Sequence, residues 1–247
     1  MLIVANWKAY VEDFEKARSL FARAKRLARD TENTIALAPP APLLGALARK
    51  NKSRVVFAAQ DVSATTGGAA TGEITARAYA SAGATYAILG HSERRAAGDT
   101  DAIVAEKMAH ALAHGLSPIL CVGERERDGE GRYLALVREE LTRAIEPLAP
   151  KERAQVIVAY EPLWAIGKTA AAAIEPNDLA EMALYIRKVL AELLPGKSSA
   201  RSLILYGGSV EPENIRALAA ASGVDGFLVG HASVDIRAFS LIVKQLS

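Results

Sequence analysis

The chain has 247 residues, of which 51% are hydrophobic and 23% are charged, and its formal net charge at pH 7 is +2. This composition is typical of a globular protein with a sizeable apolar core, and so small a charge excess predicts neither nucleic-acid binding nor attachment to a membrane surface. The one cysteine, Cys121, excludes a disulfide within the chain, so we expect a packed core thiol in a reducing, cytoplasmic compartment.

Short β-branched runs alternate with longer amphipathic segments along the whole chain. Residues 1–6 are too few and too uncharged for a signal peptide, and no apolar run approaches the roughly 20 residues of a membrane helix. The expected strands are Leu2–Ala5, Thr34–Ala38, Arg54–Ala59, Tyr86–Leu89, Ser117–Val122, Val156–Tyr160, Ser202–Tyr206 and Gly226–Val229. The expected helices include Phe14–Ala28, Ile103–His114, Tyr133–Ile145, Asp178–Leu194, Pro212–Ala221 and Ile236–Leu246, with stops at Gly115 and Gly196.

This alternation predicts a parallel sheet, and the continuous apolar strands predict burial of both of its faces. Eight strand-helix units in about 250 residues fit an α/β fold of the closed (β/α)8 type, and a doubly wound open sheet is the alternative. Because no linker or low-complexity segment interrupts the pattern, we expect residues 1–247 to form one domain.

Reactive side chains stand at the ends of several expected strands, where the active site of such a barrel lies. Glu161 follows an apolar strand and precedes Pro162, so it is either an ion-paired strand cap or a general base. Lys8 follows the first strand. It is either an ordinary surface charge or an ammonium over the barrel mouth that attracts an anionic substrate. His91 follows the fourth strand near an expected helix start, where the positive end of the helix dipole favours the neutral imidazole.

Glycine-rich turns follow the seventh and eighth strands, at Gly207-Gly208-Ser209 and at Gly230-His231. Each alone would be read as a tight turn. Two such turns at adjacent strands, each before a helix, are typical of the phosphate site of these barrels.

Two other patterns fail as sites. Gly167-Lys168-Thr169 resembles the end of a P-loop, but Pro162 occupies the position of the required first glycine. His110 and His114 could share a helix face, yet no glutamate follows His110 as in a zinc-protease motif, so we expect no metal.

Taken together and in order, these strand ends resemble the triosephosphate isomerase family over essentially the whole chain. The matching motifs are Asn6-Trp7-Lys8, Ala59-Gln60-Asp61, Thr71-Gly72-Glu73-Ile74, Ile88 to Arg95, Pro118 to Glu124, Tyr160-Glu161-Pro162, Trp164-Ala165-Ile166-Gly167 and Tyr206 to Val210. The resemblance implies a TIM barrel that interconverts dihydroxyacetone phosphate and D-glyceraldehyde 3-phosphate in glycolysis and gluconeogenesis, with neither a metal nor an organic cofactor.

The resemblance also implies the roles of the catalytic residues, which are taken from the known mechanism of the family. Glu161 matches the base that moves a proton between the first and second carbons, and His91 matches the electrophile. Lys8 and Asn6 match residues that hold the substrate and its developing charge. Glu93 matches a supporting glutamate beside the site.

Phosphate binding through backbone N–H groups is implied for Gly167, Ser209, Gly230 and His231. The segment from Pro162 to Gly167 matches the start of the family's closing loop, or lid. Lys168 to Ala173 departs from the family's usual Thr-Gly-Lys-Thr-Ala, so the lid is either shorter or has an alanine-rich second hinge.

The family is typically a homodimer in which a long loop after the third strand enters the neighbouring subunit. Residues 63–72 are long enough for this loop, and Thr71 stands at the matching position. Glu73 and Arg94 resemble a pair formed across that interface. The expected partners are therefore a small phosphorylated triose and a second copy of this chain.

Two other functions remain open alternatives. A paralogue that acts on a tetrulose phosphate would alter the strand-one motif and the lid, whereas Asn6-Trp7-Lys8 is intact here and the lid is not. A non-enzymatic phosphosugar-binding or scaffold barrel would have no need to retain Lys8, His91 and Glu161 together.

Overall fold

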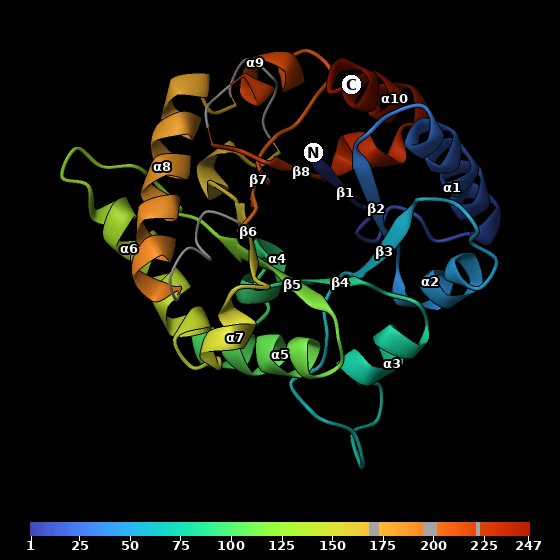
Figure 1. Cartoon of the computed structure of the whole chain (residues 1–247), viewed down its shortest axis with the longest axis horizontal. Coiled ribbons are helices and arrows are strands. Elements are labelled where there is room, and N and C mark those ends of the chain that lie inside the picture. The colour runs from blue at the N-terminus through green and yellow to red at the C-terminus, as the bar shows by residue number, and fades with distance from the viewer. Residues whose placement is uncertain (168–172, 195–201, 221–222) are drawn as a thin grey trace.

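The computed structural model describes residues 1–167, 173–194, 202–220 and 223–247. Within these ranges the strands close into a barrel in which every neighbouring pair is parallel, and β1 pairs with β8 to complete the ring (Figure 1). The strands are β1 (Leu2–Asn6), β2 (Thr34–Ala38), β3 (Val56–Ala59), β4 (Tyr86–Leu89), β5 (Ser117–Val122), β6 (Ile157–Tyr160), β7 (Ile204–Tyr206) and β8 (Gly226–Val229). This closure confirms the predicted (β/α)8 barrel and rules out the open doubly wound sheet.

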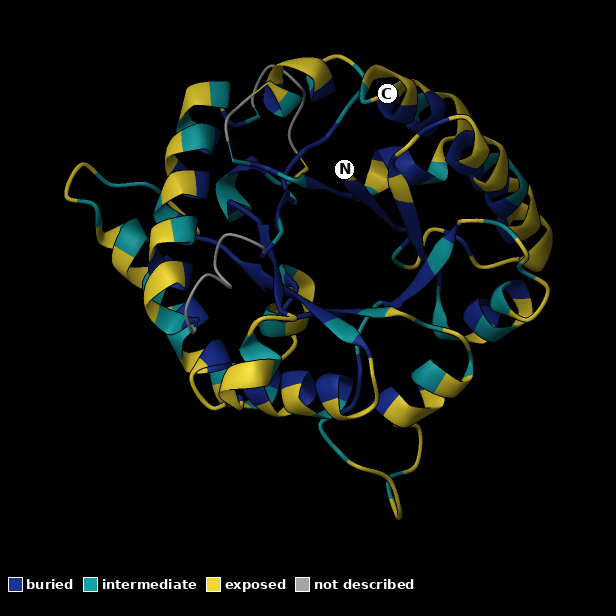
Figure 2. Cartoon of the chain, in the orientation of Figure 1, coloured by how far each residue is buried: buried dark blue, intermediate teal, exposed yellow. Residues whose placement is uncertain are grey.

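Helices surround the barrel as an outer ring, with buried faces toward the strands and exposed faces outward (Figure 2). The helices are α1 (Phe14–Arg29), α2 (Ala41–Ala48), α3 (Ala76–Ser81), α4 (Ser92–Ala96), α5 (Asp101–Ala113), α6 (Arg132–Ile145), α7 (Pro150–Arg153), α8 (Pro176–Leu193), α9 (Ile215–Ala219) and α10 (Ile236–Gln245), with short 3-10 turns at η1 (Leu163–Ala165) and η4 (His231–Val234). None of the helices in the described ranges is long and apolar enough to cross a membrane.

Alternate residues of each strand fill the barrel interior, and this alternation decides which side chains reach its mouth. The interior cluster is built from small and branched apolar side chains, namely Leu2, Val4, Ala36, Ala38, Ala58, Ile88, Ile119, Cys121, Ile157, Ala159, Leu205 and Leu228. Asn6 lies two residues beyond Val4, the last interior residue of β1, and Glu161 lies two residues beyond Ala159, the last interior residue of β6. The period of two therefore carries a polar side chain from each strand into the mouth. Cys121 is buried in this cluster, as predicted.

The expected boundaries differ from the structure by one or two residues at most helix ends and at several strand ends, and by more at the helix after β7. The helix expected from Pro212 begins only at Ile215, because Asn214 closes a turn first: its Oδ1 accepts from the Glu211 N–H at 2.9 Å and its Nδ2 donates to the Ser209 carbonyl at 3.0 Å. The expected end of that helix, Ala221, lies outside the described residues, as does the expected stop at Gly196.

Helix starts and stops otherwise follow the local signals. Thr100 caps α5, where its Oγ1 accepts from the Ile103 N–H at 3.3 Å, and Gly115 ends the segment with φ +77°. The strands β3, β6 and β7 each begin one or two residues later than the apolar pattern predicts. At β7 the Asp225 carboxylate accepts from the Ile204 N–H at 2.8 Å, which marks the first residue of the strand.

Candidate active site

A cavity of about 370 Å³ opens at the mouth of the barrel, where the carboxyl ends of the strands meet. Its volume is suited to a small metabolite. Every substrate-facing residue predicted from the sequence borders it, namely Asn6, Lys8, His91, Glu93, Glu161, Gly167, Ser209, Gly230 and His231. In the part of the chain that the structure describes, no group of three or more His, Cys, Asp or Glu side chains is arranged to hold a metal ion.

The Glu161 carboxylate lies buried beside the imidazole of His91. Its Oε1 is 3.4 Å from His91 Nε2, and its Oε2 accepts from the Ser92 N–H at 3.3 Å. A Cβ atom added to Gly207 would lie 2.8 Å from Glu161 Cγ, so only glycine lets the carboxylate occupy this place. A buried carboxylate with few donors retains lone pairs that can accept a proton from a substrate.

His91 is the N-cap of α4, as its place before an expected helix start indicated. Its Nδ1 accepts from the Glu93 N–H at 3.2 Å. An accepting Nδ1 carries no proton, so the neutral ring has its proton on Nε2, the nitrogen beside Glu161. The imidazole therefore presents an N–H donor to the cavity.

Lys8 is held in a left-handed backbone conformation, with φ 45°, which is uncommon for a residue with a side chain. Two side chains secure that conformation: Asn6 Oδ1 accepts from the Lys8 N–H at 3.0 Å, and Gln60 Nε2 donates to the Lys8 carbonyl at 2.9 Å. Lys8 borders the mouth cavity in this conformation. Asn6 thus orients Lys8 in addition to bordering the cavity, a link that the sequence did not reveal.

The Lys8 ammonium is paired with Glu93, with 2.7 Å between Lys8 Nζ and Glu93 Oε1. Partial burial disfavours the charged form of Glu93, but the hydrogen bond and charge of Lys8 outweigh it, so the pKa of Glu93 lies below its ordinary value. The carboxylate of Glu93 thus pairs with the Lys8 ammonium, and its backbone N–H donates to the His91 ring; the supporting role expected of Glu93 stays a prediction.

The two glycine-rich turns border one side of the same cavity. Ser209 is buried, and its Oγ donates to the Ala165 carbonyl at 2.8 Å, which ties the turn after β7 to the segment from Pro162 to Gly167. The His231 ring is exposed and meets Tyr10 edge to face, with 5.4 Å between ring centroids. Tyr10 was not singled out in the sequence, because nothing local marks it as a mouth residue.

The segment from Pro162 to Gly167, which is expected to begin a lid, is anchored on the buried carboxylate of Glu124. Glu124 Oε1 accepts from Tyr160 Oη at 2.8 Å, from Trp164 Nε1 at 2.9 Å and from Arg127 Nε at 3.1 Å. These charge-assisted bonds join the loop after β5 to the residues around Glu161. The departure predicted for the second half of the lid falls mostly on residues 168–172, which lie outside the described ranges.

The residues predicted for a subunit interface do not border the mouth cavity. Residues 63–72 form a loop that projects from the body of the barrel after β3 (Figure 1). Thr71 is exposed on this loop, and Glu73, which follows it directly, is exposed as well. Arg94 forms ion pairs within this chain, at 2.9 Å to Asp61 and at 3.5 Å to Asp99.

Comparison with known proteins agrees with this geometry. The family model described as triosephosphate isomerase matches residues 1–246. A triosephosphate isomerase of Thermus thermophilus is 40% identical over 247 residues, covering 99% of this chain and 98% of that protein. One of Symbiobacterium thermophilum is 39% identical over 244 residues, covering 98% and 94%, and one of Carboxydothermus hydrogenoformans is 36% identical over 247 residues, covering 98% and 97%. The chain belongs to the triosephosphate isomerase family.

Proposed function

We propose that the mouth cavity interconverts dihydroxyacetone phosphate and D-glyceraldehyde 3-phosphate, with Glu161 as the base and His91 as the electrophile. This isomerisation is the reaction of the family, which serves glycolysis and gluconeogenesis. The observation that carries the proposal is the pairing of a buried carboxylate with an imidazole N–H: Glu161 Oε1 and His91 Nε2 lie 3.4 Å apart and border one cavity. A small substrate that enters this cavity meets a proton acceptor and a proton donor together.

The chemistry follows from these two groups. Glu161 takes the proton from the carbon next to the carbonyl, and the electrons of the broken C–H bond form the double bond of an enediol. The carbonyl oxygen gains negative charge, which the His91 Nε2–H and the Lys8 ammonium stabilise. His91 gives a proton to the former carbonyl oxygen and takes the proton of the neighbouring hydroxyl, whose oxygen becomes the new carbonyl. Return of the proton from Glu161 to the former carbonyl carbon completes the aldose–ketose exchange.

The phosphate of the substrate belongs, in this proposal, at the turns after β7 and β8. Gly167, Ser209, Gly230 and His231 would contribute backbone N–H groups, and Asn6 supports the lysine that faces the substrate. The Ser209 bond to Ala165 supports closure of the lid on a bound phosphate, since it joins the turn to the lid's first segment. Closure matters because an enediolate phosphate that is exposed to water tends to lose its phosphate.

A coupled assay with D-glyceraldehyde 3-phosphate tests the function. We expect efficient turnover by the wild type and a loss of roughly a hundredfold or more in kcat for Glu161→Asp, because the shorter side chain withdraws the carboxylate by about one bond from the carbon that it must reach. Glu181→Asp, an exposed carboxylate on α8, is the matched control and should retain full activity. Turnover no better than that of a four-carbon ketose phosphate would favour the tetrulose alternative, and no turnover of either sugar by folded protein would favour a non-enzymatic barrel.

The assembly is proposed to be a cytoplasmic homodimer of one-domain subunits spanning residues 1–247. The projecting loop of residues 63–72 supports this, because an extended loop that leaves the body of the barrel has little to pack on within its own chain. In the dimer Thr71 would enter the partner, and Glu73 and Arg94 would lie at the contact. Gel filtration over a range of concentrations tests the dimer, and a monomer at every concentration would contradict it.

A further inference from the structure

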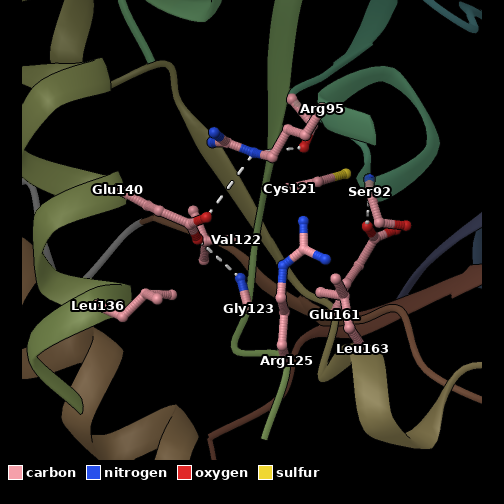
Figure 3. A pocket seen from close by; sticks show the side chains of 11 residues that line it. Ser92, Arg95, Cys121, Val122, Gly123, Arg125, Leu136, Glu140, Glu161 and Leu163 are labelled. Carbon is pink, nitrogen blue, oxygen red and sulfur yellow. Dashed lines mark hydrogen bonds and ion pairs between the residues drawn. The ribbon is translucent and has the colours of Figure 1, made fainter. Parts of the chain in front are cut away.

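A second, smaller cavity of about 70 Å³ lies behind the catalytic carboxylate. Glu161 borders it on one side, and an ion pair between Arg95 and Glu140 borders it on the other (Figure 3). Arg95 comes from α4 and Glu140 from α6, so residues far apart in the sequence meet there. Neither side chain has a part in the proton transfers described above.

Arg95 is hydrogen-bonded to Gly90, the residue that precedes His91. Its Nε donates to the Gly90 carbonyl at 2.9 Å, and its Nη1 donates to Asp101 at 2.6 Å. Gly90 has φ +69°, a left-handed conformation that turns the chain from β4 into the His91 position. Arg95 therefore fixes the backbone from which the electrophile extends.

Glu140 is hydrogen-bonded to Gly123, which packs against the backbone of Glu161. Its Oε2 accepts from the Gly123 N–H at 2.9 Å. Gly123 packs so closely on the next strand end that an added Cβ would lie 2.0 Å from the Glu161 carbonyl oxygen. A displacement of Gly123 is therefore transmitted to the base by direct contact.

The two contacts are joined across the cavity, because Arg95 Nε lies 3.8 Å from Glu140 Oε1. We propose that Arg95 and Glu140 are positioning residues that set the separation of His91 and Glu161, acting through Gly90 and Gly123. This deepens the proposed function and rests on it, since it names what keeps the acid and the base of that reaction in place.

The charge on Glu140 tunes this link. Burial raises the pKa of Glu140 to about 7, against the opposing effects of the Arg95 charge and the Gly123 N–H. The other charged or titratable groups that face it or line the same cavity are Asp101, Cys121, Glu124, Arg125 and Glu161. Below about pH 7 Glu140 gains a proton and the attraction to Arg95 weakens, whereas an acid oxygen can still accept from Gly123.

Substitution of Glu140 separates its ion pair with Arg95 from its hydrogen bond with the Gly123 N–H. Glu140→Gln keeps an acceptor for the Gly123 N–H but can never carry the charge, whereas Glu140→Met of similar length provides neither. Glu139→Gln, the neighbouring exposed glutamate of α6, is the matched control. For each variant we would measure kcat and KM with D-glyceraldehyde 3-phosphate from pH 6 to pH 9, together with the thermal unfolding midpoint.

We expect Glu140→Met to lower kcat by about 10- to 100-fold while KM stays within about twofold of the wild type, because the reacting groups are misplaced and the phosphate turns are not. Glu140→Gln should recover most of that loss at pH 6, where the wild-type acid is also neutral, and should lag behind the wild type by several-fold only above pH 7. Arg95→Lys should lower kcat in the same way, since lysine has no donor at the position of Nε, which holds the Gly90 carbonyl, while Nη1 holds Asp101.

Several outcomes would overturn the positioning role. They are a kcat for Glu140→Met within twofold of the wild type, a rise in KM that accounts for the whole loss, or a glutamine variant no better than the methionine variant. A role in folding alone would lower the unfolding midpoint and leave the pH profile of kcat unchanged. An inactive wild type would instead remove the proposed function itself, so the two failures are distinguishable.

Discussion

The substitution Gly207→Ala tests whether the base is held by close packing. Gly207 lies on the turn after β7, and an added Cβ would stand 2.8 Å from Glu161 Cγ and 3.3 Å from Glu161 Oε1. Two carbon atoms in van der Waals contact lie about 3.5–4.0 Å apart. The Glu161 side chain must therefore move by roughly 1 Å, since it is the flexible partner of this contact.

The size of the effect follows from that displacement. A misplacement of about 1 Å at a reacting group can cost about 100-fold in rate, or roughly 2.7 kcal/mol in activation free energy. Gly207 does not have a positive φ, so alanine fits its backbone without strain. The cost to stability should remain near the 1 kcal/mol end of the range of about 1–3 kcal/mol for an overpacked site.

The assay is steady-state isomerisation of D-glyceraldehyde 3-phosphate, with thermal unfolding followed by circular dichroism. Gly45→Ala is the matched control, because the same methyl group placed on α2 meets Ala82 Cβ at an ordinary 3.6 Å. We expect kcat of Gly207→Ala to fall by about 100-fold while the control is unaffected. A kcat within twofold of the wild type would refute the reasoning, because it would show that the carboxylate position is not set by this contact.

Three further predictions concern the surroundings of the base. Gly123→Ala should lower the free energy of unfolding by about 3 kcal/mol and the thermal midpoint by about 6–12 °C, since its Cβ meets the Glu161 carbonyl of the backbone; an unchanged midpoint in calorimetry would contradict the contact. Trp164→Phe keeps an aromatic ring but loses the Nε1 donor to Glu124, so chemical denaturation should show a loss of about 1–2 kcal/mol in the free energy of unfolding. Glu93→Gln removes a carboxyl whose pKa is depressed in the fold. The wild type should therefore have the larger free energy of unfolding above about pH 4.5 and lose this advantage as the pH falls through the folded pKa of Glu93. A constant difference between the two proteins in urea titrations from pH 7 to pH 3 would be inconsistent with the ion pair.

The fold was predictable because its signals are local and repeated. Continuous apolar strands, helix starts such as Thr100 and stops such as Gly115 each act within a few residues. The position of the site followed in turn, since a parallel barrel brings all carboxyl strand ends to one mouth. His91 is the clearest case, because the helix start expected beside it is present as α4, and the His91 side chain accepts from the Glu93 N–H there.

The contacts that adjust the site were beyond the reach of the sequence because they join distant segments. Gly207 was read as part of a phosphate turn, although its close approach to Glu161 depends on how β6 and β7 pack. The left-handed backbone of Lys8 depends on Gln60, which comes from the end of another strand. Glu140 is one of two adjacent glutamates on α6, and only the rotation of that helix decides which of them faces the barrel.

The environment of Glu161 explains how a carboxylate this deeply buried can be both tolerated and reactive. A buried charge is costly unless it receives hydrogen bonds, and here the donors beside it are the Ser92 N–H, the His91 Nε2 and the Cys121 thiol. Burial raises the pKa of Cys121 well above its ordinary value, and the carboxylate adds to this, so the thiol stays a neutral donor and does not become a competing nucleophile. None of the three donors carries a full positive charge, and therefore none neutralises the carboxylate as a lysine or arginine would. The carboxylate therefore keeps an oxygen lone pair that can accept the proton of the substrate, whereas a structural ion pair with a lysine or arginine would stabilise the charge and oppose that step.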